Sequence, residues 1–189
     1  MKNNLRKGFT IIEVSLVLAI AGLIFLMVFV ALPGLRASQR DTDRRESIMS
    51  FLEEVKNYQK NNRGALPGTS DDTGNTTVMV EWSEGLTGSN TTWAGFYKDY
   101  LGERFMDADG TNYKLVVFTC DVSEIGEKCK NSELNNLYDG EITKFPNDYK
   151  LLVVLRASCN GNEAVATKNP RKLAVLYKLE GAGVYCNNT

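Results

Sequence analysis

The sequence contains no histidine, the commonest general base and metal ligand at neutral pH. It also lacks a G-x-S-x-G sequence, a P-loop and a C-x-x-C pair, which are signatures of serine hydrolases, nucleotide hydrolases and zinc sites. We therefore expect no catalytic residues, no metal site and no cofactor. A membrane-anchored enzyme acting outside the cytoplasm is the least favoured alternative.

Charge is nearly absent from residues 9–35, where Glu13 is the one ionisable side chain. Within this segment, residues 16–32 form a run of 17 apolar residues. About 20 apolar residues cross a bilayer as a helix, so the segment is long enough to span a membrane. A carboxylate inside such a span is unfavourable, and it is therefore a candidate functional group that needs a partner.

A short basic leader precedes the apolar segment. Residues 1–8 contain Lys2, Arg6 and Lys7 but no acid, so we expect this end in the cytoplasm and the rest of the chain outside it. A secretory signal peptide fits poorly, because its apolar core has only about 7–15 residues and ends at a small-residue cleavage site. A plain membrane anchor fits the length but explains neither Glu13 nor the Gly8-Phe9 pair.

The junction between leader and apolar segment reads KGFTIIEV over residues 7–14. In this segment the chain resembles the type IV pilins and pseudopilins. The resemblance implies that a prepilin peptidase cleaves after Gly8 and that the new N-terminal residue, Phe9, is methylated. It also implies that Glu13 pairs with the N-terminal amine of a neighbouring subunit during filament assembly. We count Thr10 with Glu13 as a candidate assembly residue.

One long helix is expected from about Phe9 to Asn62, with a stop at residues 61–64. Its first half is apolar all round, and its second half has a single apolar stripe that would pack on a globular head. Pro33 and Gly34 lie inside it. Because Pro33 has no N–H to donate, the helix is expected to kink or loosen there.

Arg36, Arg40 and Arg44 are spaced four residues apart and therefore form a line on one face of the expected helix. They could bind acids of a neighbouring subunit or lipid phosphates. The favoured interpretation is a solvated face whose charge is balanced by the acids of residues 41–46.

Three motifs of the head have a functional and a simpler interpretation. Aromatic residues at 93–105 repeat at helical spacing, which fits a sugar-binding face but more simply a short helix packed on a sheet. Residues 106–112 could suggest calcium, but they depart from the EF-hand pattern after Asp109, which favours an Asp-Gly turn before a strand. Asn75 and Asn90 begin weak glycosylation patterns.

The head, residues 64–189, is expected to begin with a loop over 64–112, since residues 64–92 are rich in Gly, Ser, Thr, Asn and Asp. Strand-like runs occupy 113–119, 149–157 and 172–179, and residues 184–186 can return as a short fourth strand. This order predicts an α+β fold in which an antiparallel sheet over 113–189 packs on the long helix, as in pilin heads. The remaining divisions are a leader (1–8), a transmembrane or filament-core helix (9–35) and its amphipathic continuation (36–63).

All four cysteines lie in the head, and an even number outside the cytoplasm predicts disulfide bonds. Four cysteines allow three pairings, and the sequence alone does not choose among them. We favour Cys120 with Cys129, which closes a short loop. The other favoured pair, Cys159 with Cys186, resembles the C-terminal disulfide loop of many pilins.

The favoured function is that of a structural subunit of a type IV pilus-like filament. A pseudopilin of a type II secretion or DNA-uptake (competence) system is the main alternative, and the head sequence does not separate the two. The expected partners are other copies of the chain, the prepilin peptidase, the inner-membrane assembly machinery and the membrane.

Localisation and charge follow from the same features. The chain is expected to be a single-pass inner-membrane protein with its head outside the cytoplasm, and later part of a surface filament. From Phe9 onward it has 19 basic and 23 acidic residues, a net charge of −4, which gives no general attraction to nucleic acid.

Overall fold

The computed structural model describes residues 8–68, 77–120, 125–129, 151–180 and 183–189. The chain divides into two compact units, Met1–Gln39 and Arg40–Thr189, and helix α1 (Ile11–Asn61) contributes to both. Several predicted features lie outside the described residues: leader residues 1–7, the glycosylation pattern at Asn75, and the start of the strand expected at 149.

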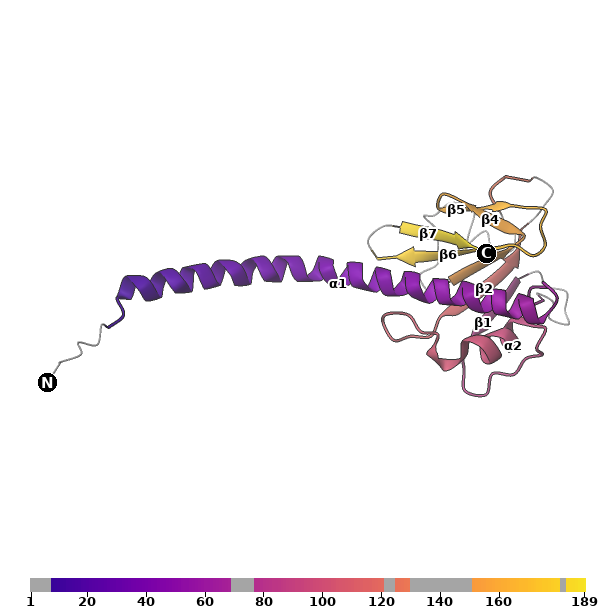
Figure 1. Ribbon diagram of the computed structural model, residues 1–189, viewed down its shortest axis with the longest axis horizontal. Coiled ribbons are helices and arrows are strands. Elements are labelled where there is room, and N and C mark those ends of the chain that lie inside the picture. The colour runs from indigo at the N-terminus through magenta and orange to yellow at the C-terminus, as the bar shows by residue number, and fades with distance from the viewer. Residues whose placement is uncertain (1–7, 69–76, 121–124, 130–150, 181–182) are drawn as a thin grey trace. The chain divides into compact units, whose positions relative to one another are not determined.

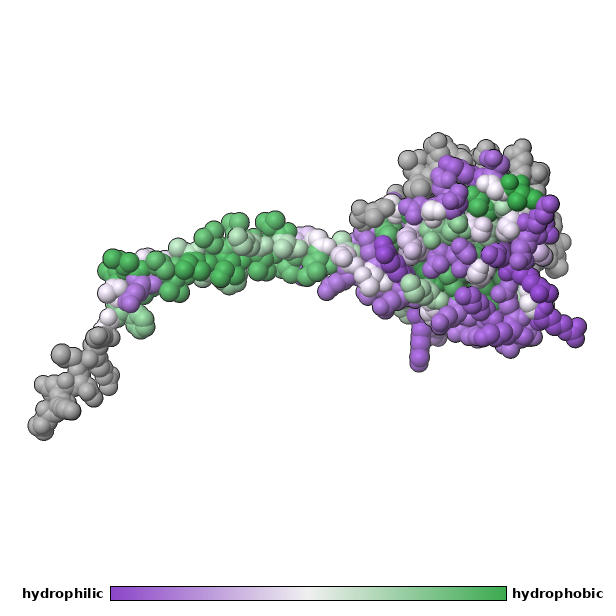
Figure 2. Space-filling view, turned by 45° about the horizontal axis from the view of Figure 1, so that its top comes forward, coloured by the Kyte–Doolittle hydropathy of each residue, from purple (hydrophilic) through white to green (hydrophobic). Residues whose placement is uncertain are grey.

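The first unit is an apolar helical segment without a core of its own. None of its described side chains is buried, and large apolar residues from Phe9 to Leu35 are exposed (Figure 2). Its most apolar 18-residue window has a mean hydropathy of 2.9, and α1 is the one helix of the described chain that could cross a membrane by length and composition. Such a surface is stable in lipid or against other apolar helices, and unfavourable in water. The assigned helix runs through Pro33, where a kink stays a prediction.

The second unit is built on a five-stranded sheet with the strand order β1-β2-β3-β6-β7 (Figure 1). Its strands are β1 (Thr77–Glu81), β2 (Lys114–Thr119), β3 (Leu151–Leu155), β6 (Leu173–Leu179) and β7 (Gly183–Asn188). A smaller sheet pairs β4 (Ala157–Asn160) with β5 (Glu163–Ala166). Neighbouring strands are antiparallel except β2 and β3, which are parallel.

The α+β class is therefore confirmed, and the sheet is mostly antiparallel, with two corrections to its details. The expectation of an antiparallel sheet throughout was wrong for β2 and β3. Parallel strands need a connection of a dozen or more residues, and 31 residues separate β2 from β3. The expectation of a loop over 64–112 was wrong for β1, because five strand residues were hidden in a segment with loop composition. The β4–β5 hairpin was also not predicted.

Both faces of the sheet are buried. Alternate residues of each central strand face opposite sides, and each set packs into a buried cluster of its own. One face packs on α1 through the predicted stripe of Ile48, Phe51, Leu52, Val55 and Tyr58. Sheet residues in that cluster include Leu115, Val117, Leu151, Val153, Leu173, Val175 and Tyr177. The opposite face is covered by β4, β5 and the cysteines, and its cluster includes Val116, Phe118, Leu152, Val154 and Leu176.

The aromatic repeat is part of this core, as the structural interpretation predicted. Thr92 caps helix α2 (Trp93–Phe96), which continues into a π-helical turn (Tyr97–Leu101). Trp93, Phe96 and Tyr97 have no exposed surface. Phe96 meets Phe51 of α1 edge-on, with ring centroids 5.9 Å apart. A sugar-binding face would need exposed rings, so these three residues serve packing instead.

The disulfides join the pairs that the sequence analysis favours, Cys120 with Cys129 and Cys159 with Cys186. Cys186→Ser is expected to lower the free energy of unfolding by roughly 2–5 kcal/mol, because it removes a constraint that ties β4 to β7. Thermal or denaturant unfolding of the oxidised full-length chain measures this loss. Non-reducing peptide mapping tests the pairing, and a peptide joining Cys120 to Cys186 or Cys129 to Cys159 would contradict it.

Candidate functional site

The start of α1 brings the predicted assembly residues Thr10 and Glu13 together. The Thr10 backbone N–H and its hydroxyl donate to Glu13 Oε2 at 3.0 and 2.9 Å, and the Glu13 N–H lies 3.3 Å from Thr10 Oγ1. Each side chain therefore satisfies the other residue's backbone N–H, the arrangement called a capping box. A capping residue is not itself helical, which is why α1 begins at Ile11 and not at Phe9 as expected.

The predicted cleavage junction, Gly8-Phe9, lies directly before this cap and is exposed to solvent. Phe9 is 89% exposed, and a Cβ added at Gly8 would meet nothing within 4 Å. The chain's own packing therefore does not require glycine at position 8. The two bonds that Glu13 accepts within the described chain both go to Oε2, so Oε1 can accept from a further donor.

Residues 3–29 match the sequence family described as the prokaryotic N-terminal methylation motif. The chain carries a type IV pilin-like prepilin leader. This leader marks structural subunits that are generally not enzymes, and it implies processing by a prepilin peptidase. The head lies outside the match, and no curated protein and no solved structure matches the chain.

A group of charged side chains in the second unit, the ion-pair cluster, consists of Arg40, Arg44, Asp107 and Glu180. The Arg40 guanidinium donates to both oxygens of Glu180 at 2.7 and 2.5 Å. The Arg44 guanidinium donates to both oxygens of Asp107 at 2.8 and 3.0 Å, and its Nη2 lies 3.1 Å from Glu180 Oε1. The cluster therefore ties α1 to the end of β6 and to the turn before β2.

Burial and charge act together in the ion-pair cluster. The Asp107 side chain is 1% exposed and that of Arg44 is 14% exposed. Hydrogen bonding to Asp107 raises the pKa of Arg44, and hydrogen bonding to Arg40 lowers the pKa of Glu180. Burial, and then the Asp107 charge, raise the pKa of Tyr113, whose hydroxyl lies 3.1 Å from Asp107 Oδ1. The raised pKa of Arg40 and of Arg44 and the lowered pKa of Glu180 keep these three groups charged at neutral pH.

The structure corrects the interpretation of the arginine line. Arg40 and Arg44 do not form a solvated face balanced by acids of their own helix, because acids of the head reach them. Asp41 is the one helical acid that takes part among the described ion pairs, 3.6 Å from Arg44. Arg36 lies in the other compact unit. Only tertiary packing brings Asp107 and Glu180 to the helix, so no spacing in the sequence could have identified them.

Residues 107–110 form the Asp-Gly turn that the sequence favours over a calcium loop, with the Gly110 N–H donating to the Asp107 carbonyl at 2.8 Å. Asp107 binds Arg44, and Asp109 Oδ1 accepts from the N–H and the hydroxyl of Thr111. Gly110 has a φ of +82°, which suits the Asp-Gly turn. In the ranges that the structure describes, no three His, Cys, Asp or Glu side chains lie close enough together to hold a metal ion.

Proposed function

We propose that the chain is a prepilin that is cleaved after Gly8, N-methylated at Phe9 and assembled into a type IV pilus-like filament. The observation that carries the proposal is the single carboxylate of Glu13, held near the start of the exposed and otherwise uncharged segment 9–35, directly after a prepilin-type leader. A role as a plain membrane anchor does not explain that carboxylate, because a charge within a membrane span is unfavourable.

The physical chemistry of assembly follows from this arrangement. Lipid is already apolar, so moving the surface of residues 9–35 from the membrane into a filament gains free energy through close packing and polar pairing. Cleavage after Gly8 creates an amine at Phe9. A buried carboxylate needs a partner, and the neighbouring subunit's Phe9 amine supplies one, with Glu13 Oε1 as the available acceptor.

The same leader would serve a pseudopilin of a type II secretion or DNA-uptake system. Both roles use an assembling apolar helix and an exposed head, so filament length and neighbouring genes discriminate between them. Electron microscopy of sheared surface preparations, with mass spectrometry of their subunits, tests the pilus assignment. Long filaments that contain this chain support a pilus, whereas short membrane-associated assemblies support the pseudopilin.

A bulky residue at position 8 is expected to block processing. Gly8→Leu should leave the full leader attached, because a peptidase pocket that accepts glycine has little room, while Gly8→Ala should be partly cleaved. Nothing in the chain's own packing opposes either substitution, so the fold is expected to be unchanged. Immunoblots of membrane fractions measure the mass shift of cleavage. Full cleavage of Gly8→Leu would contradict the proposed site.

A further inference from the structure

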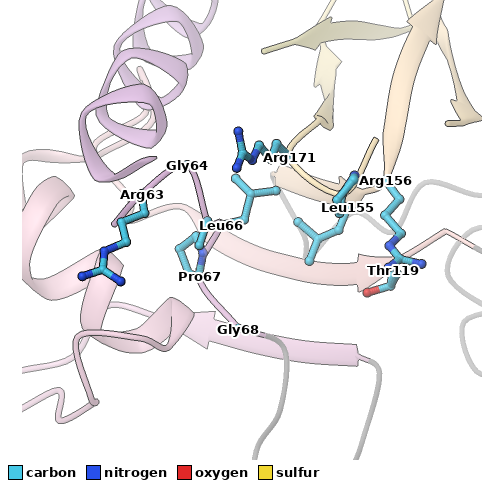
Figure 3. Close-up of a pocket in the computed structure, with 11 residues that line it drawn as sticks. Arg63, Gly64, Leu66, Pro67, Gly68, Thr119, Leu155, Arg156 and Arg171 are labelled. Atoms are coloured by element: carbon cyan, nitrogen blue, oxygen red, sulfur yellow. The ribbon is translucent and has the colours of Figure 1, made fainter. Parts of the chain in front are cut away.

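Three arginines from separate parts of the chain surround one hollow of about 420 Å³ in the head. Arg63 follows the end of α1, Arg156 links β3 to β4, and Arg171 precedes β6. Figure 3 shows Arg63 and Arg156 on opposite sides of Leu66, with Arg171 between them. All three side chains are exposed, and Leu66 and Leu155 add an apolar wall.

The backbone at two of these arginines is in an uncommon conformation. Arg63 has a φ of 54° and Arg156 a φ of 56°, and they are the two non-glycine residues with positive φ in the described ranges. Arginine is not among the residues enriched in this left-handed region, which are Gly, Asn and Asp. At Arg156, hydrogen bonds to Lys172 and Thr167 hold the conformation, at 2.9 and 2.8 Å. Such conformations cluster at functional sites, because the surrounding structure has to maintain them.

A second, more open hollow of about 650 Å³ adjoins the first and shares Arg63, Gly64 and Arg171 with it. The two hollows together define the basic surface, which consists of Lys56, Lys60, Arg63, Arg156, Arg171 and Lys172. Among the residues that the structure describes, no acidic side chain lines either hollow, and none forms an ion pair with these six cations. Thr189 also lines the second hollow.

This concentration of positive charge does not follow from the composition of the head. The unit Arg40–Thr189 contains 18 basic and 22 acidic residues, a net charge of −4. Six cations with no acidic side chain among the described residues that line the hollows are therefore a local feature of an otherwise acidic unit. Like charges gathered in this way repel one another, and a bound polyanion would relieve the repulsion.

We propose that the basic surface binds the phosphodiester backbone of double-stranded DNA. An arginine guanidinium binds a phosphate through two parallel hydrogen bonds, and each neutralised phosphate releases counterions from the duplex. Duplex DNA carries one charge per about 1.7 Å of its axis, so it can engage cations spread over two hollows, which a single small anion cannot. No aromatic side chain of the described ranges lines either hollow for bases to stack on, which favours a duplex over a single strand.

The ligand is identified by charge and geometry, and no base-specific contact is implied. Backbone contacts position a duplex without reading its sequence. The proposal does not rest on filament assembly, because the basic surface lies wholly within Arg40–Thr189. Its failure would leave the proposed function unaffected, and a failure to assemble would leave DNA binding by the isolated subunit unaffected.

The test uses the full-length chain in a non-ionic detergent and a fluorescent DNA duplex of mixed sequence. Arg63→Asn/Arg156→Asn removes two charges while placing a residue that tolerates a left-handed backbone at each position. The matched control, Lys98→Gln/Arg104→Gln, removes two exposed cations that lie outside both hollows. Circular dichroism melting checks the fold of each variant. If Arg63→Asn/Arg156→Asn does not fold, Arg171→Gln/Lys172→Gln replaces it.

Fluorescence anisotropy at several salt concentrations gives the affinity and its salt dependence. We expect the affinity of the unsubstituted chain to fall steeply with salt, and the variant of the basic surface to bind about tenfold more weakly, with its salt slope reduced by about 2. The control should bind within about twofold of the unsubstituted chain, since its charges contact no phosphate. Equal weakening of both variants, or no binding at low salt, would overturn the proposal. Displacement of the duplex by polyglutamate as effectively as by unlabelled DNA would overturn it in favour of an acidic protein partner.

Discussion

A Glu13→Gln subunit is expected to be cleaved and inserted normally but to be almost absent from filaments. Glutamine keeps the size of the side chain and can still accept the hydrogen bonds from Thr10, so the start of α1 should form. It removes the negative charge that the amine of a neighbouring Phe9 would meet. In an apolar surrounding that amine would then lack a counter-charge. The free energy of burying an unpaired charge is high enough to prevent assembly. The fraction of subunits in sheared filaments, measured by immunoblot against the membrane pool, gives the result.

Ser15→Ala is the matched control for this experiment. Ser15 is a second polar residue near the start of α1, and its hydroxyl donates to the Ile12 carbonyl within the same helix turn. Its loss should leave assembly near normal, because no charge is involved. Wild-type amounts of Glu13→Gln in sheared filaments would contradict the assembly role. A failure of cleavage would instead place Glu13 in recognition by the peptidase.

Arg44→Ala is expected to lower the free energy of unfolding by about 3–5 kcal/mol, because it leaves the buried Asp107 carboxylate without its counter-charge. The Tyr113 hydroxyl would remain as a hydrogen-bond donor but carries no charge at neutral pH. Denaturant unfolding of the full-length chain in detergent, followed by tryptophan fluorescence, measures the loss. Trp93 is suited to report it, because it lies in the same core as α1.

The adjacent Arg45 supplies the control for the ion-pair cluster. Its guanidinium lies 5.0 Å from the ring centre of the partly exposed Tyr185, so Arg45→Ala should cost about 0.5–1 kcal/mol. Replacing Arg44 and Asp107 together by apolar residues should recover much of the stability lost in Arg44→Ala. A buried ion pair often stabilises the folded state no more than well-packed apolar residues of similar volume do. An Arg44→Ala loss no larger than that of Arg45→Ala would show that the buried pair does not hold the turn before β2 to the helix.

The elements with a regular hydrophobic pattern could be predicted from the sequence. The stripe from Ile48 to Tyr58 follows the helical period, and the strands near 113–119 and 172–179 are runs of apolar and β-branched residues bounded by turns. Strand β1 could not be recognised in this way, because its five residues form only a short apolar run within a long segment of polar residues. The direction of β3 beside β2 depends on how the chain returns to the sheet, and no local pattern encodes that.

Contacts between charged residues that are distant in the sequence could not be predicted either. The sequence placed Arg40 and Arg44 on one helix face, but their partners Asp107 and Glu180 lie 63 and 136 residues further along the chain from Arg44. Arg63, Arg156 and Arg171 are likewise brought together by the fold alone. By contrast, the residues from Gly8 to Glu13 form one contiguous segment, so their likeness to a prepilin junction could be read directly.

The mass of the subunit recovered from sheared surface filaments tests the central proposal most directly. Intact-mass and N-terminal fragment spectra should show a chain that begins at Phe9 and carries one methyl group on its amine, with the two disulfides of the head formed. A mature terminus beyond Ala31 would identify an ordinary signal peptide. An uncleaved chain, or one that never enters filaments, would equally contradict a role as a processed structural subunit.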